Sequence, residues 1–189
     1  DDMKMSKSLG NVVGPLDLVA NYGSDALRYY LMRNMVLGQD STFTFKSFVE
    51  RYNADLANDY GNVVNRVLVL IQKYFSSKIP SPGDYNNTDL ELISQVKEVP
   101  VKVEQLMNKL KIHEATDTIF TLVRSINKYL EEKEPWKTIK EHPSQKDVTA
   151  TTLYVSLESI RISTCLLNPI IPNKSNQVLA AMGFKKNEN

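Results

Sequence analysis

The sequence predicts an all-α protein: an antiparallel helical bundle preceded by a short loop-helix-strand segment. Apolar residues recur at intervals of three and four along most of the 189 residues, which is the spacing of one buried helix face. A loop rich in proline and glycine at residues 80–84 separates two such stretches. Hydrophobic residues make up 42% of the chain and charged residues 24%, the balance of a globular protein.

The N-terminal part of the sequence, up to residue 45, is expected to form two short helices and a short strand. A helix over 15–21 opens with a proline, which is tolerated in the first turn, and Gly23 ends it. A second helix follows over about 24–36, with Ser24 or Asp25 as its cap. Residues 42–45, Thr-Phe-Thr-Phe, alternate in the way that predicts the one short strand.

Longer helices are expected in the rest of the chain. One runs from Lys46 to about Phe75. Thr88 and Glu91 have the spacing of a capping box, which opens the next helix, and Pro100 kinks or divides that helix. A helix over 113–132 has five positions that should face inward. A short helical turn follows from Pro135, a long helix runs from Gln145 to about Leu167, and Pro172 opens a last helix near 178–182. The five inward positions are Ala115, Ile119, Leu122, Ile126 and Leu130.

Charge and cysteine content narrow the possible functions. The 23 basic residues are almost balanced by 22 acidic residues. Any RNA contact must therefore come from a local patch or from base contacts. No run of about 18 apolar residues occurs, so we expect a cytoplasmic protein with no membrane partner.

Cys165 is the single cysteine, which excludes a disulfide framework and a cysteine zinc site, and no metal site is predicted. Its apolar surroundings predict an inert core residue.

Residues 4–8, Lys-Met-Ser-Lys-Ser, form a motif suited to binding phosphate. Lys4 and Lys7 place two ammonium groups three residues apart, Ser8 adds a hydroxyl, and Gly10 permits a tight turn. Such a loop can close over a polyphosphate and stabilise the charge on departing pyrophosphate, an effect typically worth about 3–4 kcal/mol. The alternative is a solvated, charged segment.

This motif, followed by Leu-Gly-Asn, resembles the second signature of class I aminoacyl-tRNA synthetases. The resemblance implies that Lys7 contacts the ATP phosphates and stabilises adenylate formation, with Lys4 and Ser8 assisting. It also implies ATP with Mg²⁺ as cofactors of the full-length enzyme and none bound by this fragment alone. Residues 51–62 and 127–136 resemble the methionyl enzymes more specifically, which implies methionine tRNA as partner, with methionine and ATP in the full-length enzyme.

The resemblance also implies a division of the chain. Residues 22–31 are similar to the stem-contact helix of this class, so residues 1–43 are expected to hold the KMSKS loop and the stem-contact segment. Residues 44–189 are expected to form a helical-bundle anticodon-binding domain. The His-x-Gly-His signature of the class is absent, so we expect the C-terminal part of a longer enzyme, unable to aminoacylate tRNA alone.

Two other interpretations remain open from the sequence. One is another class I synthetase with a helical anticodon domain, such as the leucyl, isoleucyl, valyl or cysteinyl enzyme. The other is a non-enzymatic helical RNA-binding or scaffold protein in which the lysines of the motif are incidental.

Four polar or aromatic residues are candidates for RNA contact. Asn58, Asn62 and Arg66 recur at intervals of four, so they share one helix face. Amide and guanidinium groups carry the donors and acceptors that recognise a base edge, and Trp136 offers a surface on which an unstacked base can lie. A polar stripe is more often a solvated face, and a lone tryptophan is more often packing. The family resemblance implies that Asn62, Arg66 and Trp136 contact the CAU anticodon, and Gly61 would let a partner approach the backbone closely.

Overall fold

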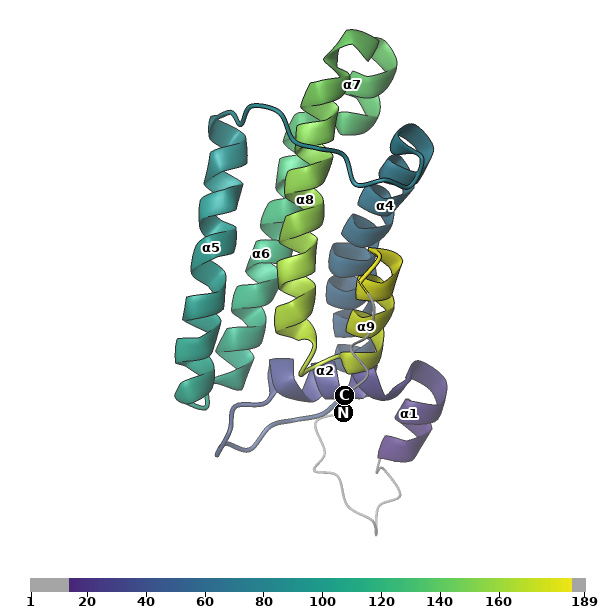
Figure 1. Ribbon diagram of the computed structural model, residues 1–189. Helices are drawn as coiled ribbons and strands as arrows, with labels where there is room; N and C mark the ends of the chain where they lie inside the picture. Colours follow the sequence, from purple (N-terminus) through teal and green to yellow (C-terminus); the bar gives the residue numbers. More distant parts are fainter. Residues whose placement is uncertain (1–13, 185–189) are drawn as a thin grey trace.

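The structure is a computed structural model in which residues 14–184 are described. Every regular element within this range is helical, so the all-α prediction is confirmed. Three helices of 22 residues, α5 (Asn87–Asn108), α6 (Ile112–Lys133) and α8 (Lys146–Leu167), stand side by side and alternate in direction (Figure 1). Pro100 lies inside α5, which continues undivided.

A fourth column of the bundle is built from three elements without a break. These are α3 (Phe45–Arg51), the π-helical segment η2 (Tyr52–Gly61) and α4 (Asn62–Phe75). The predicted helix over 46–75 is therefore confirmed in extent, but its middle has a wider hydrogen-bond pattern, in which the amide of Asn62 donates to the carbonyl of Ala57. Such segments are rare and are often found at functional sites.

The geometry of this π-helical segment explains why residue 61 is a glycine. A β-carbon added to Gly61 would lie 3.1 Å from the backbone oxygen of Leu56, which is tighter than an ordinary contact. The glycine thus relieves crowding within the helix, whether or not a partner approaches it from outside.

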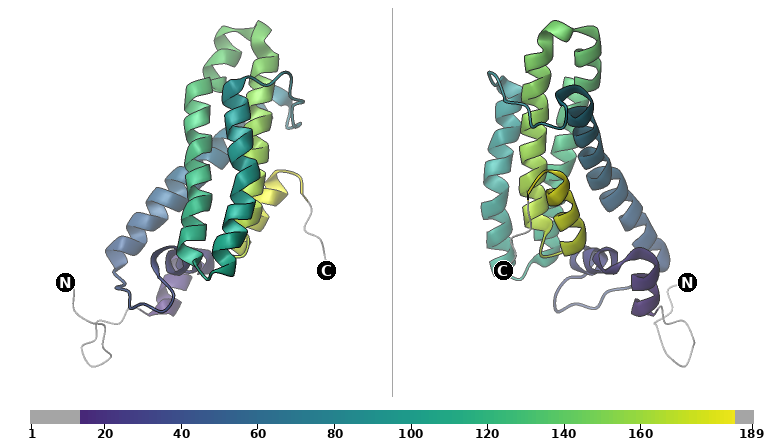
Figure 2. Two further views of the ribbon diagram at one scale, coloured as in Figure 1. Left: turned by 90° about the vertical axis from the view of Figure 1, so that its left-hand side faces the viewer. Right: turned by 45° about the vertical axis from the view of Figure 1, so that its right-hand side comes forward.

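Short helices close the two ends of the bundle (Figures 1 and 2). At one end lie α1 (Pro15–Tyr22) and α2 (Ser24–Asn34), and α2 crosses beneath the long helices. At the other end α7 (Pro135–Glu141) and the 3₁₀ turn η3 (Pro143–Gln145) connect α6 to α8. The last helix, α9 (Pro172–Ala181), packs beside α8 and the end of α2.

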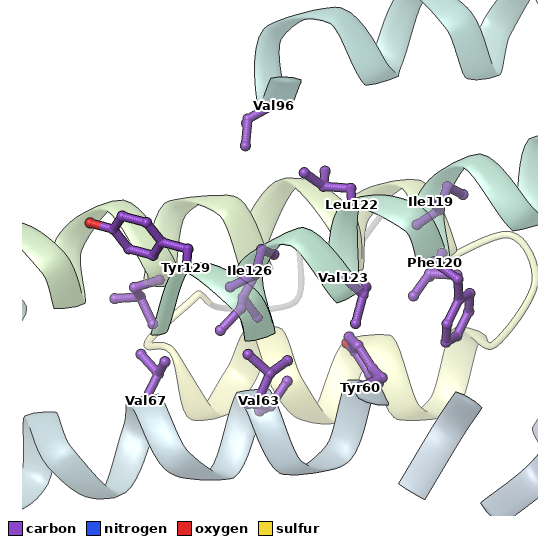
Figure 3. Packing of buried hydrophobic residues seen from close by; sticks show 14 of the residues in the cluster. Tyr60, Val63, Val67, Val96, Ile119, Phe120, Leu122, Val123, Ile126 and Tyr129 are labelled. Atoms are coloured by element: carbon purple, nitrogen blue, oxygen red, sulfur yellow. The ribbon is translucent and has the colours of Figure 1, made fainter. Parts of the chain in front are cut away.

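Helix α6 is the centre of the main hydrophobic core. Its five predicted inward residues are all at most 2% exposed, as expected from their spacing. Figure 3 shows the side chains of α6 meeting Val96 of α5 on one side and Tyr60, Val63 and Val67 of the η2–α4 column on the other. Because α6 is covered on two sides, it fixes the positions of its neighbours.

Helix α2 is held to the bundle by polar groups. Arg28 donates from Nε to the carbonyl of Ile170, at 3.0 Å, and from Nη2 to that of Pro169, at 2.6 Å. The buried carboxylate of Asp25 accepts a hydrogen bond of 2.7 Å from the amide of Lys174 in the first turn of α9. The hydroxyl of Tyr29 donates to Asp55 of η2 at 2.6 Å.

The predicted strand at residues 42–45 is wrong. Within residues 14–184 no strand occurs, and Phe45 already begins α3. Thr44 is extended because it caps that helix: its side chain accepts a hydrogen bond of 3.1 Å from the amide of Ser47. The ring of Phe43 packs edge-on against Tyr30, 5.1 Å between centroids. The alternation therefore reflects a small aromatic core and a helix cap, with no partner strand.

Two further expectations are corrected. The capping box of α5 is formed by Asn86 and Asp89, two residues before the predicted pair of Thr88 and Glu91, because each side chain accepts a hydrogen bond from the other's amide. Cys165 is exposed, not buried, since it lies on the outward face of α8.

No helix among the described residues is long and apolar enough to span a bilayer.

Candidate nucleic-acid interface

The predicted site residues fall in two groups. Lys4, Lys7 and Ser8 lie outside the residues that the structure describes. Of the others, Asn62 and Arg66 occupy the first two turns of α4, and Trp136 is the second residue of α7. Their common location depends on α6, whose last turn leads directly into α7.

Arg66 and Trp136 are brought together although 70 positions separate them in the sequence. The guanidinium carbon of Arg66 lies 5.6 Å from the centroid of the Trp136 ring, within the range of a cation–π contact. The indole is partly buried and packs against the main core, so part of its surface stays accessible. A cation and an aromatic platform therefore lie together at one end of the bundle.

Asn127 contacts Arg66 and therefore belongs to the same arrangement, although the sequence pattern does not single it out. Its Oδ1 accepts a hydrogen bond of 2.7 Å from Nη2 of Arg66. Its Nδ2 donates to the carbonyl of Asp59 at 3.0 Å and to that of Val123, one turn earlier in α6, at 3.3 Å. The signal available in the sequence was a single amide among the apolar positions of the 113–132 helix.

Asn62 is exposed and lies one helical turn before Arg66. Residues four apart on a helix are neighbours on its surface, about 5–6 Å apart at Cβ. Asn58, one turn earlier again in η2, is also exposed. The structure thus brings Arg66 and Trp136 into contact and leaves both asparagine amides facing solvent.

The charge of Arg66 is not neutralised by an acid among residues 14–184. Its hydrogen-bond partner there is the neutral amide of Asn127, and its buried Nε has no partner. Lys133, the last residue of α6, is by contrast paired with Asp89 at 2.7 Å. The guanidinium therefore keeps its full positive charge for an outside ligand.

Asp59 lies next to this arrangement on η2. Burial raises the pKa of its carboxyl group, against the lowering effect of Arg124, whose Nη1 lies 3.8 Å away. Nearby Asp55 raises it further. The carbonyl of Asp59 holds Asn127, so this residue connects the π-helical segment to α6.

A separate cavity of about 520 Å³ lies between α2, the η2–α4 column and α9. Gly61 and Asn65 line it, whereas Arg66 and Trp136 do not. No group of three histidine, cysteine or acidic side chains suited to a metal ion occurs among the described residues.

The sequence is similar to known methionine–tRNA ligases. Residues 1–68 match the family described as tRNA synthetases class I (M), and residues 79–189 match the anticodon binding domain of methionyl tRNA ligase. The methionine–tRNA ligase of Caldanaerobacter subterraneus is 40% identical over 96% of the chain and 28% of its own length. That of Synechocystis is 43% identical over 97% of the chain and 34% of its own length.

A solved structure gives the same result. Mycobacterium tuberculosis methionyl-tRNA synthetase in complex with methionyl-adenylate superposes with a TM-score of 0.93 at 32% identity, covering 97% of this chain and 36% of that protein. The chain thus spans about a third of the length of the relatives it matches. With its second family match covering more than half of the sequence, the chain belongs to the methionyl-tRNA ligase family, in the region of the anticodon binding domain.

Proposed function

We propose that this chain recognises the CAU anticodon of methionine tRNA through Asn62, Arg66 and Trp136. The observation that carries the proposal is the placement of the Arg66 guanidinium over the Trp136 indole, at the end of a bundle of this family. RNA loops are commonly recognised by aromatic rings on which splayed bases stack and by side chains that bind base edges.

The chemistry of the three side chains suits base recognition better than general binding of phosphate. The chain carries a net charge of only +1, so affinity cannot come from a broad basic surface. A base stacked on the Trp136 indole is typically worth about 1–3 kcal/mol. The guanidinium of Arg66 and the amide of Asn62 add the donors and acceptors that discriminate one base edge from another.

In the longer enzyme we propose that the first 43 residues serve the chemical step. Lys7 contacts the phosphates of ATP and stabilises the charge that builds on leaving pyrophosphate, with Lys4 and Ser8 assisting and Mg²⁺ accompanying the nucleotide. The match of residues 1–68 to class I synthetases supports this proposal. Residues 44–189 then form the anticodon-binding domain, and the whole enzyme joins methionine to its tRNA in the cytoplasm at the expense of ATP.

The alternatives considered from the sequence are not favoured. The family matched by residues 79–189 is specific to the methionyl enzyme, and the relatives named above are methionine–tRNA ligases. This argues against the leucyl, isoleucyl, valyl and cysteinyl enzymes and against a free-standing scaffold protein.

The test compares tRNAs that differ only in the anticodon. Trp136→Ala and Arg66→Ala, made in the full-length enzyme, should lower kcat/KM for aminoacylation of CAU tRNA by about 5- to 150-fold, since each loses about 1–3 kcal/mol of base contact. Their kcat/KM for tRNAs with a changed anticodon should fall much less. The matched control is Lys73→Ala, which removes an exposed cation from the same helix α4.

Generic phosphate binding predicts a different result. In that case Arg66→Ala and Lys73→Ala would weaken all tRNAs to a similar degree, and the proposed site would be refuted. Methionine-dependent pyrophosphate exchange, measured without tRNA, should be unchanged in all three variants because none of these residues belongs to the KMSKS loop.

A further inference from the structure

We infer that Asn127 is the positioning residue of this site: it acts on anticodon selection through Arg66. The inference rests on the proposed function and adds a residue that contacts no nucleotide itself. It starts from the contact between Nη2 of Arg66 and Oδ1 of Asn127, at 2.7 Å.

The orientation of the Asn127 amide is fixed by its other contacts. Its Nδ2 carries two hydrogens, and these are directed to the carbonyls of Asp59 and Val123 at 3.0 and 3.3 Å. A flipped amide would set Oδ1 against two carbonyl oxygens and Nδ2 against the guanidinium, so all three contacts would become repulsive. Oδ1 must therefore face Arg66, as an acceptor at a set position.

That acceptor limits the freedom of a long side chain. Arginine loses up to about 2 kcal/mol of rotamer entropy when it is ordered, so a residue that orders it before the ligand arrives removes this cost from binding. The guanidinium carbon lies 5.6 Å from the centroid of the Trp136 ring, and the hydrogen bond to Asn127 fixes the guanidinium at a second point. Because Asn127 is neutral, it orders the guanidinium without neutralising it.

Asn127 also makes the site depend on the π-helical segment. The carbonyl of Asp59 belongs to the last turn of η2, and Asn127 belongs to α6. The amide thus spans the η2–α4 column and α6, the two elements that carry Arg66 and lead to Trp136. A loss of this bridge frees the guanidinium and leaves the indole in place.

The experiment is a double-mutant cycle in the full-length enzyme, with Asn127→Ala, Arg66→Ala and the double variant. The readout is the ratio of kcat/KM for CAU tRNA to that for a tRNA with one changed anticodon base. We expect Asn127→Ala to lower this ratio about tenfold, the value of one charge-assisted hydrogen bond. The double variant should be no worse than Arg66→Ala, because Asn127 has no effect once the guanidinium is gone.

Controls separate positioning from folding. Asn168→Ala removes another half-buried asparagine, which donates to Asn176 at 3.2 Å at the end of the molecule near α2, and should leave the ratio unchanged. Circular dichroism and pyrophosphate exchange verify that each variant is folded. If Asn127→Ala does not fold, Asn127→Asp carries the test: it keeps an oxygen toward Arg66, loses both donors and neutralises the guanidinium, so the ratio should fall as well.

Three results would overturn the inference. Two of them concern Asn127 alone, and the third would also refute the proposed anticodon function. An unchanged ratio in folded Asn127→Ala, or losses from Asn127 and Arg66 that simply add, would show that Asn127 does not act through Arg66. If Arg66→Ala itself leaves the ratio unchanged, the proposed anticodon function fails and the inference falls with it.

Discussion

Replacing Asp89 should lower the free energy of unfolding more than replacing any other single carboxylate of the bundle. It is 2% exposed and joins α5 to α6, since it accepts hydrogen bonds of 2.7 Å from both Nζ of Lys133 and the hydroxyl of Tyr129. Its second oxygen accepts from the amide of Asn86 at 2.9 Å, as half of the capping box. Asp89→Ala removes all three contacts and leaves a nearly buried ammonium group behind.

The expected loss follows from these contacts. Removing one partner of a buried ion pair costs about 3–5 kcal/mol. Lys133 keeps a second acceptor, Oδ1 of Asn86 at 2.8 Å, so we expect the lower end, about 3 kcal/mol. With a urea slope of about 2 kcal/mol per molar, the midpoint of unfolding should fall by roughly 1.5 M. The assay is urea unfolding of the 189-residue chain followed by circular dichroism at 222 nm.

The matched control is Glu132→Gln, which removes an exposed carboxylate of α6, 3.6 Å from Lys128. Exposed pairs of this kind contribute at most about 1 kcal/mol and often nothing measurable. If Asp89→Ala lowers the free energy of unfolding by no more than Glu132→Gln does, the role assigned to Asp89 is refuted.

The same carboxylate predicts a dependence on pH. Burial raises the pKa of Asp89, but the hydrogen bonds from Lys133, Asn86 and Tyr129 together outweigh it and hold the pKa below its ordinary value. A carboxyl group with a pKa lowered by folding adds stability above its unfolded pKa of about 3.9, and this is lost as the pH falls through the folded value. The stability difference between the unsubstituted chain and Asp89→Asn should therefore shrink below about pH 4.

Three further predictions concern other groups. Burial raises the pKa of Tyr60 to about 12 and also raises those of Tyr29 and Tyr129, so absorbance at 295 nm should show these three of the nine tyrosines un-ionised at pH 11 while the chain stays folded. The stability that they add is present below about pH 10 and is lost above it. Cys165, exposed on α8, should react with a thiol reagent without denaturant, and a thiol that reacts only in urea would contradict this. In the full-length enzyme, Lys7→Ala should slow pyrophosphate exchange far more than it changes methionine affinity, and an unchanged exchange rate would refute its assignment.

Helices with a regular apolar face could be predicted from the sequence. The residues of α6 that recur at three and four positions are buried, because a helix covered by neighbours on two sides has no other way to hide them. The same pattern predicts the column over 46–75. It does not predict the π-helical middle of that column, because a wider turn changes the hydrogen bonds without removing the apolar pattern.

Local signals failed where two motifs share the same residues. Thr42-Phe43-Thr44-Phe45 has the alternation of a strand, yet Thr44 is a helix cap and Phe43 packs on Tyr30. Thr88 has the chemistry of a cap, but Asn86 has it as well and starts the helix earlier. Tertiary contacts decide between such options, and a single sequence does not contain them.

The residues of the candidate site can be predicted from the sequence, but the contacts that hold them in place cannot. The family resemblance implies that Arg66 and Trp136 act together on the anticodon, and the path of α6 and α7 brings the two side chains into contact. Asn127 could not be ranked above other asparagines, because its role depends on the carbonyl of Asp59 and on the guanidinium of Arg66. Positioning residues of this kind are defined by neighbours that are distant in the sequence.

The polar links that hold α2 to the bundle have a mechanical consequence. Arg28 ties α2 to the segment between α8 and α9, and Asp25 ties it to the first turn of α9, so α2 cannot tilt without breaking several short hydrogen bonds. The rigid span between the two ends is set by α6, whose 22 residues measure about 33 Å. A domain attached through α1 would therefore be held at a constant distance from Trp136, at the opposite end of the bundle.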